Sequence, residues 1–538
     1  MRVADFFCGG GGFSEGFRQA GFDIVFAVDK WEPAVDTYKG NKPGVNVIKD
    51  DVIRISRLPD DEFEALVPDS EVIIGSPPCQ SFSHSNKSGN ADKSIGIQLI
   101  EAYLRIIARK KYKKESILRY WVLENVPAVK SYIKEEYTAQ DLGLDGDFVL
   151  RPHDGASGKY NAKYFGAPTN RERYLCGEFP KPVEIRSDAD VTTLKMVLDS
   201  LGDPLREDDS LVTDINYPDF SINNQQITDQ HYVYELAEFE WKTAKRLKQD
   251  KGYMGKMSFP ENILKPARTV MATMSSSSRE AMILGYRDNQ YRLPTVREAA
   301  CMMSFPVDYW FYGKSKGTKH TLVGNAVPPK MSYAIAKAIA TAEGLTVPNY
   351  YPRIIHDESM EFINLNGAAF ELKKERPRRQ IAKFKYHIPY LIINMFRVEL
   401  TNYHSDFEKK IFKWDVEIHF NQGKTRARKY TPILNLNDLP EEYHLKILDF
   451  TDKVRRKIPG ANMFQQVFCM TSEMKQKKNL MGPYELLDLV KEFIDNTIPE
   501  NRQDELIVID EAPNKLPLAI IVGYYILFSI INEMGGMS

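Results

Sequence analysis

The sequence has few of the features that mark secreted, disulfide-bonded or zinc-binding proteins. Its 538 residues include only five cysteines, which lie far apart and form no Cys-x-x-Cys pair. An odd number with this spacing argues against a disulfide framework and against a zinc site. We therefore expect a reducing compartment and no bound metal. The N-terminus begins directly as a strand, so we also expect no signal peptide.

Excess charge and long apolar runs are scarce as well. The formal net charge is −1, so a surface that binds a polyanion must be local. The mostly apolar run 516–531 is broken by Pro517 and Gly523 and is short for a membrane span. We expect it to form a buried helix or a pair of strands, without a membrane partner. The length predicts two or three domains.

A short loop around Cys79 is the most informative stretch of the chain. The apolar run 71–74 predicts a buried strand, and Gly75, Pro77 and Pro78 cannot continue it. Cys79 is therefore expected on a rigid loop at the carboxyl end of a strand, where open α/β sheets place their chemistry. A lone cysteine is most often a small buried side chain. Here polar residues follow at once, which favours a functional thiol.

The N-terminal segment has the pattern of a nucleoside-binding unit. A strand over 2–7 is followed by four glycines, an amphipathic helix over 13–20 and a second strand over 24–28 that ends on Asp29. Glycines let a ligand approach the backbone, and a carboxylate at the end of the second strand can accept hydrogen bonds from both ribose hydroxyls. Ser14 stands where a dinucleotide-binding loop has its third glycine.

Further strand ends carry polar groups. A third strand over 45–48 leads to Asp51, whose carboxylate either accepts from an adenine amine or is a solvated loop acid. A strand over 120–123 leads to Glu124, and Arg171 and Arg173 alternate before a strand over 174–176. Taken alone, these residues are more often surface charges than catalysts. A thiolate, a carboxyl group and an arginine at adjacent strand ends suit covalent catalysis on an electron-poor ring such as cytosine.

Six segments resemble, in unpermuted order, the sequence motifs of the cytosine-5 DNA methyltransferases of bacterial restriction-modification systems. They are residues 5–13, 75–83, 124–126, 171–173, 293–306 and 324–329. The resemblance implies an α/β fold with a Rossmann-like methyltransferase core, a small target-recognition domain and an extra C-terminal α+β domain. The expected bounds are 1–178 for the core, completed by 320–343, then 179–319 for recognition and 345–538 for the extra domain.

The resemblance also implies individual roles. Cys79 would be the nucleophile, Glu124 the proton donor to N3, and Arg173 the anchor of a flipped-out cytidine, supported by Arg171. S-adenosylmethionine would be the cofactor, and double-stranded DNA and a cognate restriction endonuclease would be partners in the bacterial cytoplasm, at the nucleoid. The residues expected to bind the cofactor are Phe7, Gly9, Gly11, Asp29, Asp51, Val52, Pro78, Asn325 and Val327. Those expected to touch DNA are Gln80, Ser83 and Ser85.

Two departures from the family pattern and two alternatives remain open. Thr169 replaces a usual glutamine that bonds to the catalytic loop, and Trp31 replaces a common aspartate beside the cofactor. One alternative is an RNA cytosine methyltransferase of the same fold. The other is a DNA-binding or scaffolding protein with an inactive core, against which the intact Cys79, Glu124 and Arg173 weigh.

The chain beyond residue 344 lacks the family pattern. Residues 373–385 form its most basic stretch, which predicts a phosphate contact or, equally, a solvated basic face. Alternation over 414–420 predicts a strand, and a return strand follows the turn at 421–423. Residues 486–494 are expected in the core. Residues 506–511 mimic the acidic strand of an ATPase, but the chain has no phosphate-binding loop to accompany it.

Overall fold

The chain folds into two compact units. The computed structural model describes residues 1–79, 82, 93–249, 257–420, 428–458 and 460–535. The first unit comprises residues 1–236 and 260–371, and the second comprises residues 237–259 and 372–538. The first unit thus continues to Glu371, and the second begins with a segment taken from the middle of the chain. The expected bounds at 178 and 319 stay predictions.

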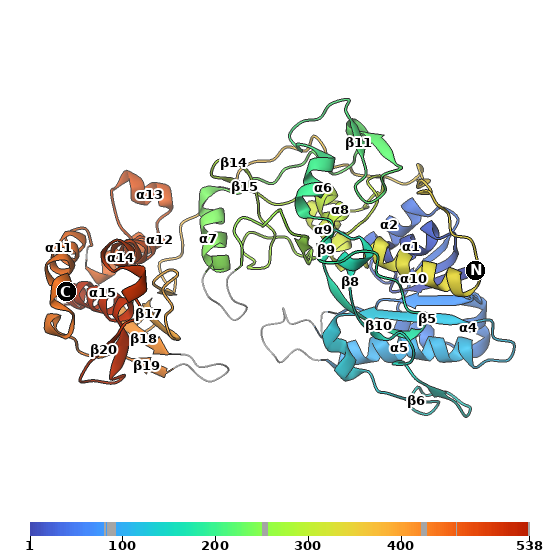
Figure 1. Cartoon of the computed structure of the whole chain (residues 1–538), viewed down its shortest axis with the longest axis horizontal. Coiled ribbons are helices and arrows are strands. Elements are labelled where there is room, and N and C mark those ends of the chain that lie inside the picture. The colour runs from blue at the N-terminus through green and yellow to red at the C-terminus, as the bar shows by residue number, and fades with distance from the viewer. Residues whose placement is uncertain (80–81, 83–92, 250–256, 421–427, 459, 536–538) are drawn as a thin grey trace. The chain divides into compact units, whose positions relative to one another are not determined.

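A seven-stranded sheet forms the centre of the first unit (Figure 1). Its strand order is β3-β2-β1-β4-β5-β10-β8, and the first five strands are parallel. β10 runs antiparallel to both of its neighbours. The strands are β1 (Arg2–Phe6), β2 (Asp23–Asp29), β3 (Asn46–Lys49), β4 (Val72–Gly75), β5 (Tyr120–Asn125), β8 (Gly158–Asn161) and β10 (Glu172–Glu178). This mixed α/β architecture confirms the predicted fold class.

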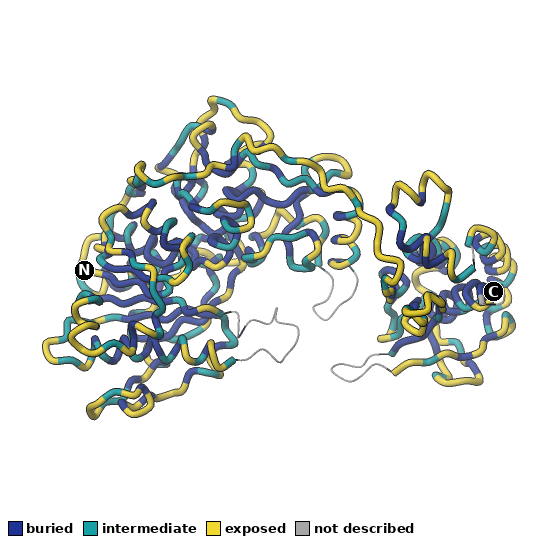
Figure 2. The backbone as a smooth tube through the Cα atoms, turned by 180° about the vertical axis from the view of Figure 1, so that it is seen from behind, coloured by how far each residue is buried: buried dark blue, intermediate teal, exposed yellow. Residues whose placement is uncertain are grey.

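Helices cover both faces of this sheet, and successive strand residues pack in opposite cores. Figure 2 shows the backbone of the sheet as largely buried. Val3 packs on one face, against α1 (Gly12–Gln19), α2 (Glu32–Asn41) and α10 (Pro329–Ala342). Ala4 packs on the other, against α3 (Val52–Ser56), α4 (Asp60–Leu66) and α5 (Ser94–Lys111). Burial of strands on both faces explains why their sequences read as near-continuous apolar runs.

The remainder of the first unit consists of short strands and helices around residues 194–325. They pack on their own apolar core, which includes Phe305, Tyr309 and Leu322. These elements are α6 (Leu194–Leu201), β11 (Leu211–Thr213), β12 (Ser221–Asn223), β13 (Ala267–Arg268), β14 (Leu284–Arg287), β15 (Gln290–Arg292), α8 (Val296–Met302) and α9 (Lys316–Asn325), and β13 pairs with the short strand β9 (Thr169–Asn170). The strands β6 (Tyr137–Thr138) and β7 (Val149–Leu150) pair with each other, and Tyr137 and Leu150 pack in the same core as Ala4.

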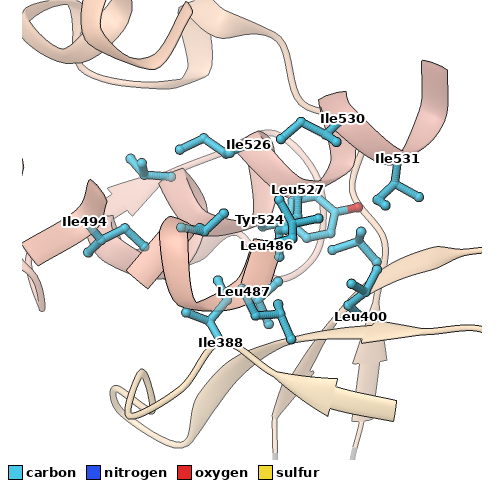
Figure 3. Close-up of a cluster of buried hydrophobic side chains, with 14 of the residues drawn as sticks. Ile388, Leu400, Leu486, Leu487, Ile494, Tyr524, Ile526, Leu527, Ile530 and Ile531 are labelled. Atoms are coloured by element: carbon cyan, nitrogen blue, oxygen red, sulfur yellow. The ribbon is translucent and has the colours of Figure 1, made fainter. Parts of the chain in front are cut away.

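The second unit packs helices against a four-stranded antiparallel sheet, in the order β16-β17-β18-β19. Figure 3 shows its core, where Leu486 and Leu487 of α14 and Tyr524 and Leu527 of α15 meet Leu400 of β17. The elements are α7 (Glu238–Gln249), β16 (Lys385–His387), β17 (Phe396–Thr401), β18 (Asp415–Phe420), β19 (Arg428–Tyr430), α11 (His444–Arg455), α12 (Ala461–Cys469), α13 (Ser472–Lys477), α14 (Pro483–Thr497), β20 (Leu506–Val508), β21 (Lys515–Pro517) and α15 (Leu518–Gly535).

The apolar run at the end of the sequence forms the core of this unit. Its residues occupy the end of β21 and most of α15, and the side chains of Leu518 to Val522 are fully buried. This confirms the predicted buried helix. In the part of the chain that the structure describes, no helix is both long enough and apolar enough to span a bilayer.

Candidate active site

The glycine loop after β1 adopts backbone conformations that few side chains tolerate. Gly9 and Gly11 have φ values of +52° and +82°, and Phe7 has a φ of +54°. A bulky residue in the left-handed region is uncommon and strained, and such strain concentrates at binding sites. A side chain at position 9 would meet no atom within 4 Å, so the loop is open there. The loop can therefore bring its backbone against a ligand.

Asp29 ties this loop to the next helix. Its two carboxylate oxygens accept hydrogen bonds from the backbone N–H of Gly9, at 2.9 Å, and of Trp31, at 2.8 Å. Burial raises the pKa of Asp29, and these backbone donors oppose the rise. Each oxygen keeps a lone pair for a ribose hydroxyl. The Trp31 contact uses only backbone, so the departure from the family pattern leaves Asp29 in place.

The carboxylate of Asp51, two residues after the end of β3, caps a helix. Asp51 is the N-cap of α3, and its carboxylate accepts from Ile53 N–H at 2.8 Å. Lys30 Nζ lies 3.4 Å from the second oxygen, and Val52 is buried. Asp29 and Asp51 follow neighbouring parallel strands at the same edge of the sheet. A nucleoside lying along that edge can reach both.

The Cys79 loop is fixed by the strand beside it. Asn125, at the end of β5, donates from Nδ2 to Pro77 O at 2.9 Å, and Ser76 N–H donates to Phe6 O at 3.2 Å. Cys79 is half-buried, whereas the other four cysteines are buried. Burial raises the pKa of each of those four thiols. Cys79 is therefore the accessible thiol of the chain.

Glu124 and Arg173 form a buried ion pair beside this loop. Arg173 Nε lies 2.9 Å from Glu124 Oε1, and the two residues are 8% and 5% exposed. The pairing of β10 with β5 brings them together, because Leu175 is the register partner of Glu124. Burial raises the pKa of Glu124, while Arg173 and Arg171 oppose the rise. A carboxyl group in this environment retains a proton more readily than an exposed one.

Arg171 is engaged by backbone. Its guanidinium donates to Gly324 O and Ala326 O, both at 3.0 Å, and to Val270 O at 3.4 Å. Burial and the nearby Arg173 lower the pKa of Arg171 to about 9, and the charges of Glu124 and Cys79 act in the opposite direction. The thiol, the carboxyl group and both arginines thus lie in one electrostatic environment. Arg171 also clamps the segment that carries Asn325 and Val327.

That returning segment packs on the glycine loop. A Cβ at Gly12 would lie 2.4 Å from Val327 O, so the two backbones are in close contact. Val327 is buried and Asn325, the last residue of α9, is exposed. Thr169 is buried, and its hydroxyl donates to Arg268 O at 3.3 Å, joining β9 to β13. Gln80, Ser83 and Ser85 lie outside the described residues, so their DNA contacts stay predictions.

Sequence reasoning missed a buried polar network behind the glycine loop. Tyr309 Oη donates to Gly10 O at 2.6 Å, and Lys42 Nζ donates to Tyr309 Oη at 3.0 Å and to Gly11 O at 3.4 Å. Ser332 Oγ donates to Gly12 O at 3.2 Å. Three successive loop carbonyls are therefore held from the protein side. Tyr309 lies three residues after the motif segment 293–306, whereas nothing in the sequence marked Lys42.

One group of potential metal ligands occurs among the described residues, in the second unit. Glu399, Glu417 and His419 are buried on neighbouring strands, with ligand atoms within 4.8 Å of one another. Arg397 Nε lies 2.6 Å from Glu399, and Lys429 Nζ lies 2.9 Å from Glu417. Protein cations thus already neutralise both carboxylates, and the group is an ion-pair network.

Comparisons with known proteins identify the family of this chain. The model of the C-5 cytosine-specific DNA methylase family matches residues 1–341. The type II methyltransferase M.MthTI of Methanothermobacter thermautotrophicus is 28% identical over 63% of this chain and 97% of its own length. M.NgoPII of Neisseria gonorrhoeae is 27% identical, over 63% of this chain and 95% of its own. The crystal structure of the S. pombe Dnmt2 methyltransferase matches with a TM-score of 0.42 and 18% identity, over 64% of this chain and 99% of its own. The chain belongs to the C-5 cytosine-specific DNA methylase family and is a DNA cytosine-5 methyltransferase.

Proposed function

We propose that the enzyme methylates C5 of a cytosine that is flipped out of a specific duplex DNA site, through a covalent bond between Cys79 and C6. The observation that carries this proposal is the accessible Cys79 thiol in the same electrostatic environment as the buried Glu124–Arg173 pair. A base inside the duplex cannot reach groups at the end of a sheet, so the cytosine must leave the stack.

In this mechanism the Cys79 thiolate adds to C6 and converts the C5=C6 bond into an enamine, whose C5 is nucleophilic. Glu124, whose pKa is raised by burial, donates a proton to N3 and stabilises the charge that develops on the ring. Arg173 holds the Glu124 carboxyl group in place and anchors the cytidine. After C5 is methylated, loss of H5 as a proton re-forms the double bond and expels the thiolate.

S-adenosylmethionine supplies the electrophilic methyl group when bound. The residues present fit such a cofactor. Gly9 and Gly11 offer open backbone, Phe7 provides an aromatic ring at a strained position, and Asp29 offers two acceptor oxygens for a ribose. Asp51 with Val52 would hold the adenine edge. Pro78 from the Cys79 loop and Asn325 with Val327 from the returning segment would complete the site.

The names of the relatives support a role in host defence. M.MthTI and M.NgoPII are named type II methyltransferases. We therefore infer that this enzyme is the modification half of a type II restriction-modification system. Its partners would be double-stranded DNA and a cognate restriction endonuclease, and it would act in the bacterial cytoplasm at the nucleoid.

Trapping on fluorinated DNA tests the mechanism. Fluorine at C5 of cytosine prevents loss of the C5 substituent, so an active enzyme remains covalently attached. We expect DNA of diverse sequence containing 5-fluorodeoxycytidine to yield a denaturant-stable adduct in the presence of S-adenosylmethionine. Cys79→Ser should bind DNA and cofactor but give no adduct. An adduct that persists in Cys79→Ser, or one that forms only on RNA, would contradict the proposal.

A further inference from the structure

The two units carry charges of opposite sign, which the overall net charge of −1 conceals. The first unit has 40 lysines and arginines against 48 aspartates and glutamates, a net charge of −8. The second has 32 against 25, a net charge of +7. DNA is a polyanion, and most of its affinity for proteins comes from contacts between cations and phosphates. The unit that contains the candidate active site does not provide this attraction through its net charge.

Positive charge is also concentrated within the second unit. Residues 237–259 and 372–430 contain 21 lysines and arginines against nine acids, whereas residues 431–538 contain 11 against 16. The densest stretch is 373–385, called the basic segment below, with seven cations and the single acid Glu375. An uneven distribution of this kind creates a local positive potential.

The basic segment is fixed to the body of the unit. Arg378 N–H donates to Cys469 O at 2.8 Å, and its guanidinium donates to Phe468 O at 3.2 Å and lies 5.0 Å from the Phe468 ring. Glu375 accepts from Ser472 N–H at 2.7 Å, at the start of α13. The single acid and one arginine therefore serve as anchors.

Three exposed cations of the basic segment have neither a carboxylate nor an aromatic ring of the described residues as a partner. Lys374, Arg376 and Arg379 are exposed, and no carboxylate of the described residues lies within 4 Å of them. About half of the other exposed cations described in this unit have such a partner, as Lys453 has Asp449 at 2.6 Å. Cations that are held by an anchored backbone and are not neutralised are suited to bind phosphates.

Helix α7 connects the basic segment to the recognition region. Glu240 of α7 lies 3.4 Å from Lys373, and the Arg246 guanidinium lies 4.5 Å from the ring of Tyr484, which Arg378 also approaches at 5.9 Å. In sequence, α7 lies between β12 and β13, inside the region 179–319 expected to recognise the target. The chain thus enters and leaves the second unit from within that region.

We propose that Lys374, Arg376 and Arg379 form a phosphate-binding surface through which the second unit holds the backbone of the substrate duplex. The proposal rests on the proposed function, because it assigns a second contact to the same DNA. The second unit thereby contributes affinity that is independent of sequence, while the first unit performs recognition and chemistry.

The salt dependence of DNA binding tests this surface in the full-length enzyme. The triple variant Lys374→Gln, Arg376→Gln, Arg379→Gln should bind DNA more weakly. The slope of log K against log [salt] should be shallower by up to about 2.7, since each lost phosphate contact removes about 0.9. Single-turnover methylation at saturating DNA should match the wild type, because these residues lie outside the candidate active site.

A matched control removes the same charge from α11 and its C-cap residue, in the triple variant Lys446→Gln, Lys453→Gln, Arg456→Gln. Its slope should equal that of the wild type. Equal slopes for all three proteins, or equal reductions in both variants, would overturn the proposal. Failure of the proposed function is a separate result, because it would appear as absence of methyl transfer by the wild type, whereas the slopes are measured by binding alone.

Discussion

Replacing Lys42 by methionine tests whether the polar network behind the glycine loop positions the cofactor. Lys42 Nζ lies 3.4 Å from Glu15 Oε2, and the two side chains are 2% and 0% exposed. The same ammonium group donates to Gly11 O and to Tyr309 Oη. Methionine keeps the length of the side chain but removes the charge and all of its donors.

The expected loss of stability depends on the partners that Glu15 keeps after the substitution. Removal of one partner of a buried ion pair costs about 3–5 kcal/mol. Glu15 keeps Arg18, at 2.7 Å, and Gln19, at 2.9 Å, so we expect the lower end of that range. For a unit of this size, 1 kcal/mol corresponds to about 1.4 °C, and the melting temperature of the first unit should fall by about 4–5 °C. Loss of the donor to Gly11 O should weaken binding of S-adenosylmethionine about tenfold.

Calorimetry measures both quantities, the first by thermal scanning and the second by titration with S-adenosylmethionine. Lys39→Met is the matched control, because Lys39 is exposed on the same helix. It should change the free energy of unfolding by less than about 0.5 kcal/mol and leave cofactor affinity unaltered. If Lys42→Met behaves like Lys39→Met in both assays, the network has no positioning role.

Three further substitutions have expected outcomes. Burial raises the pKa of Asp5 to about 7. As pH rises, the unfolded chain therefore loses this proton before the folded protein does, and stability falls between about pH 4 and about pH 7. Asp5→Asn removes this loss, so it should stabilise the protein by about 2–3 kcal/mol more at pH 8 than at pH 5, as measured by denaturant unfolding. Gly12→Ala places a methyl group against Val327 O and should cost about 1–3 kcal/mol or more by the same assay, whereas Gly317→Ala, whose added methyl group would lie 3.8 Å from Ser315 Oγ, should cost nothing. Glu124→Gln cannot supply a proton and should slow single-turnover methylation about 10²–10⁴-fold, with DNA affinity nearly unchanged; a rate near that of the wild type would exclude Glu124 as the proton donor.

The central sheet could be predicted from the sequence because its strands are buried on both faces and end in distinctive residues. The run before Gly75 and the glycines after Phe7 mark strand ends by rules of backbone conformation. The placement of Glu124 beside Arg173 was accessible only through the family resemblance, since these residues are 49 positions apart and meet through an antiparallel pairing.

Other features depend on tertiary packing that local pattern does not encode. Lys42 has no sequence signature, because an isolated lysine is usually a solvated surface charge. It is buried only because Glu15 and Tyr309 arrive from distant segments. Likewise, the sequence pattern of α7 indicates a helix but does not indicate which residues of the chain pack against it. That partner, Asp488 of α14, lies 242 residues later than Arg246 in the chain.

The insertion of α7 has a consequence for synthesis of the protein. Helix α7 ends at Gln249, and α14, which supplies Tyr484 and Asp488 as its partners, ends at Thr497. At translation rates of about 5–20 residues per second, α7 waits about 10–50 s on the ribosome before these partners emerge. During this time residues 237–259, which interrupt the first unit, have been made but lack the rest of the second unit. The second unit can therefore complete its fold only near the end of translation. A nonsense mutation or premature termination anywhere in the last 160 or so residues would therefore leave a defect in the middle of the protein as well as at its end.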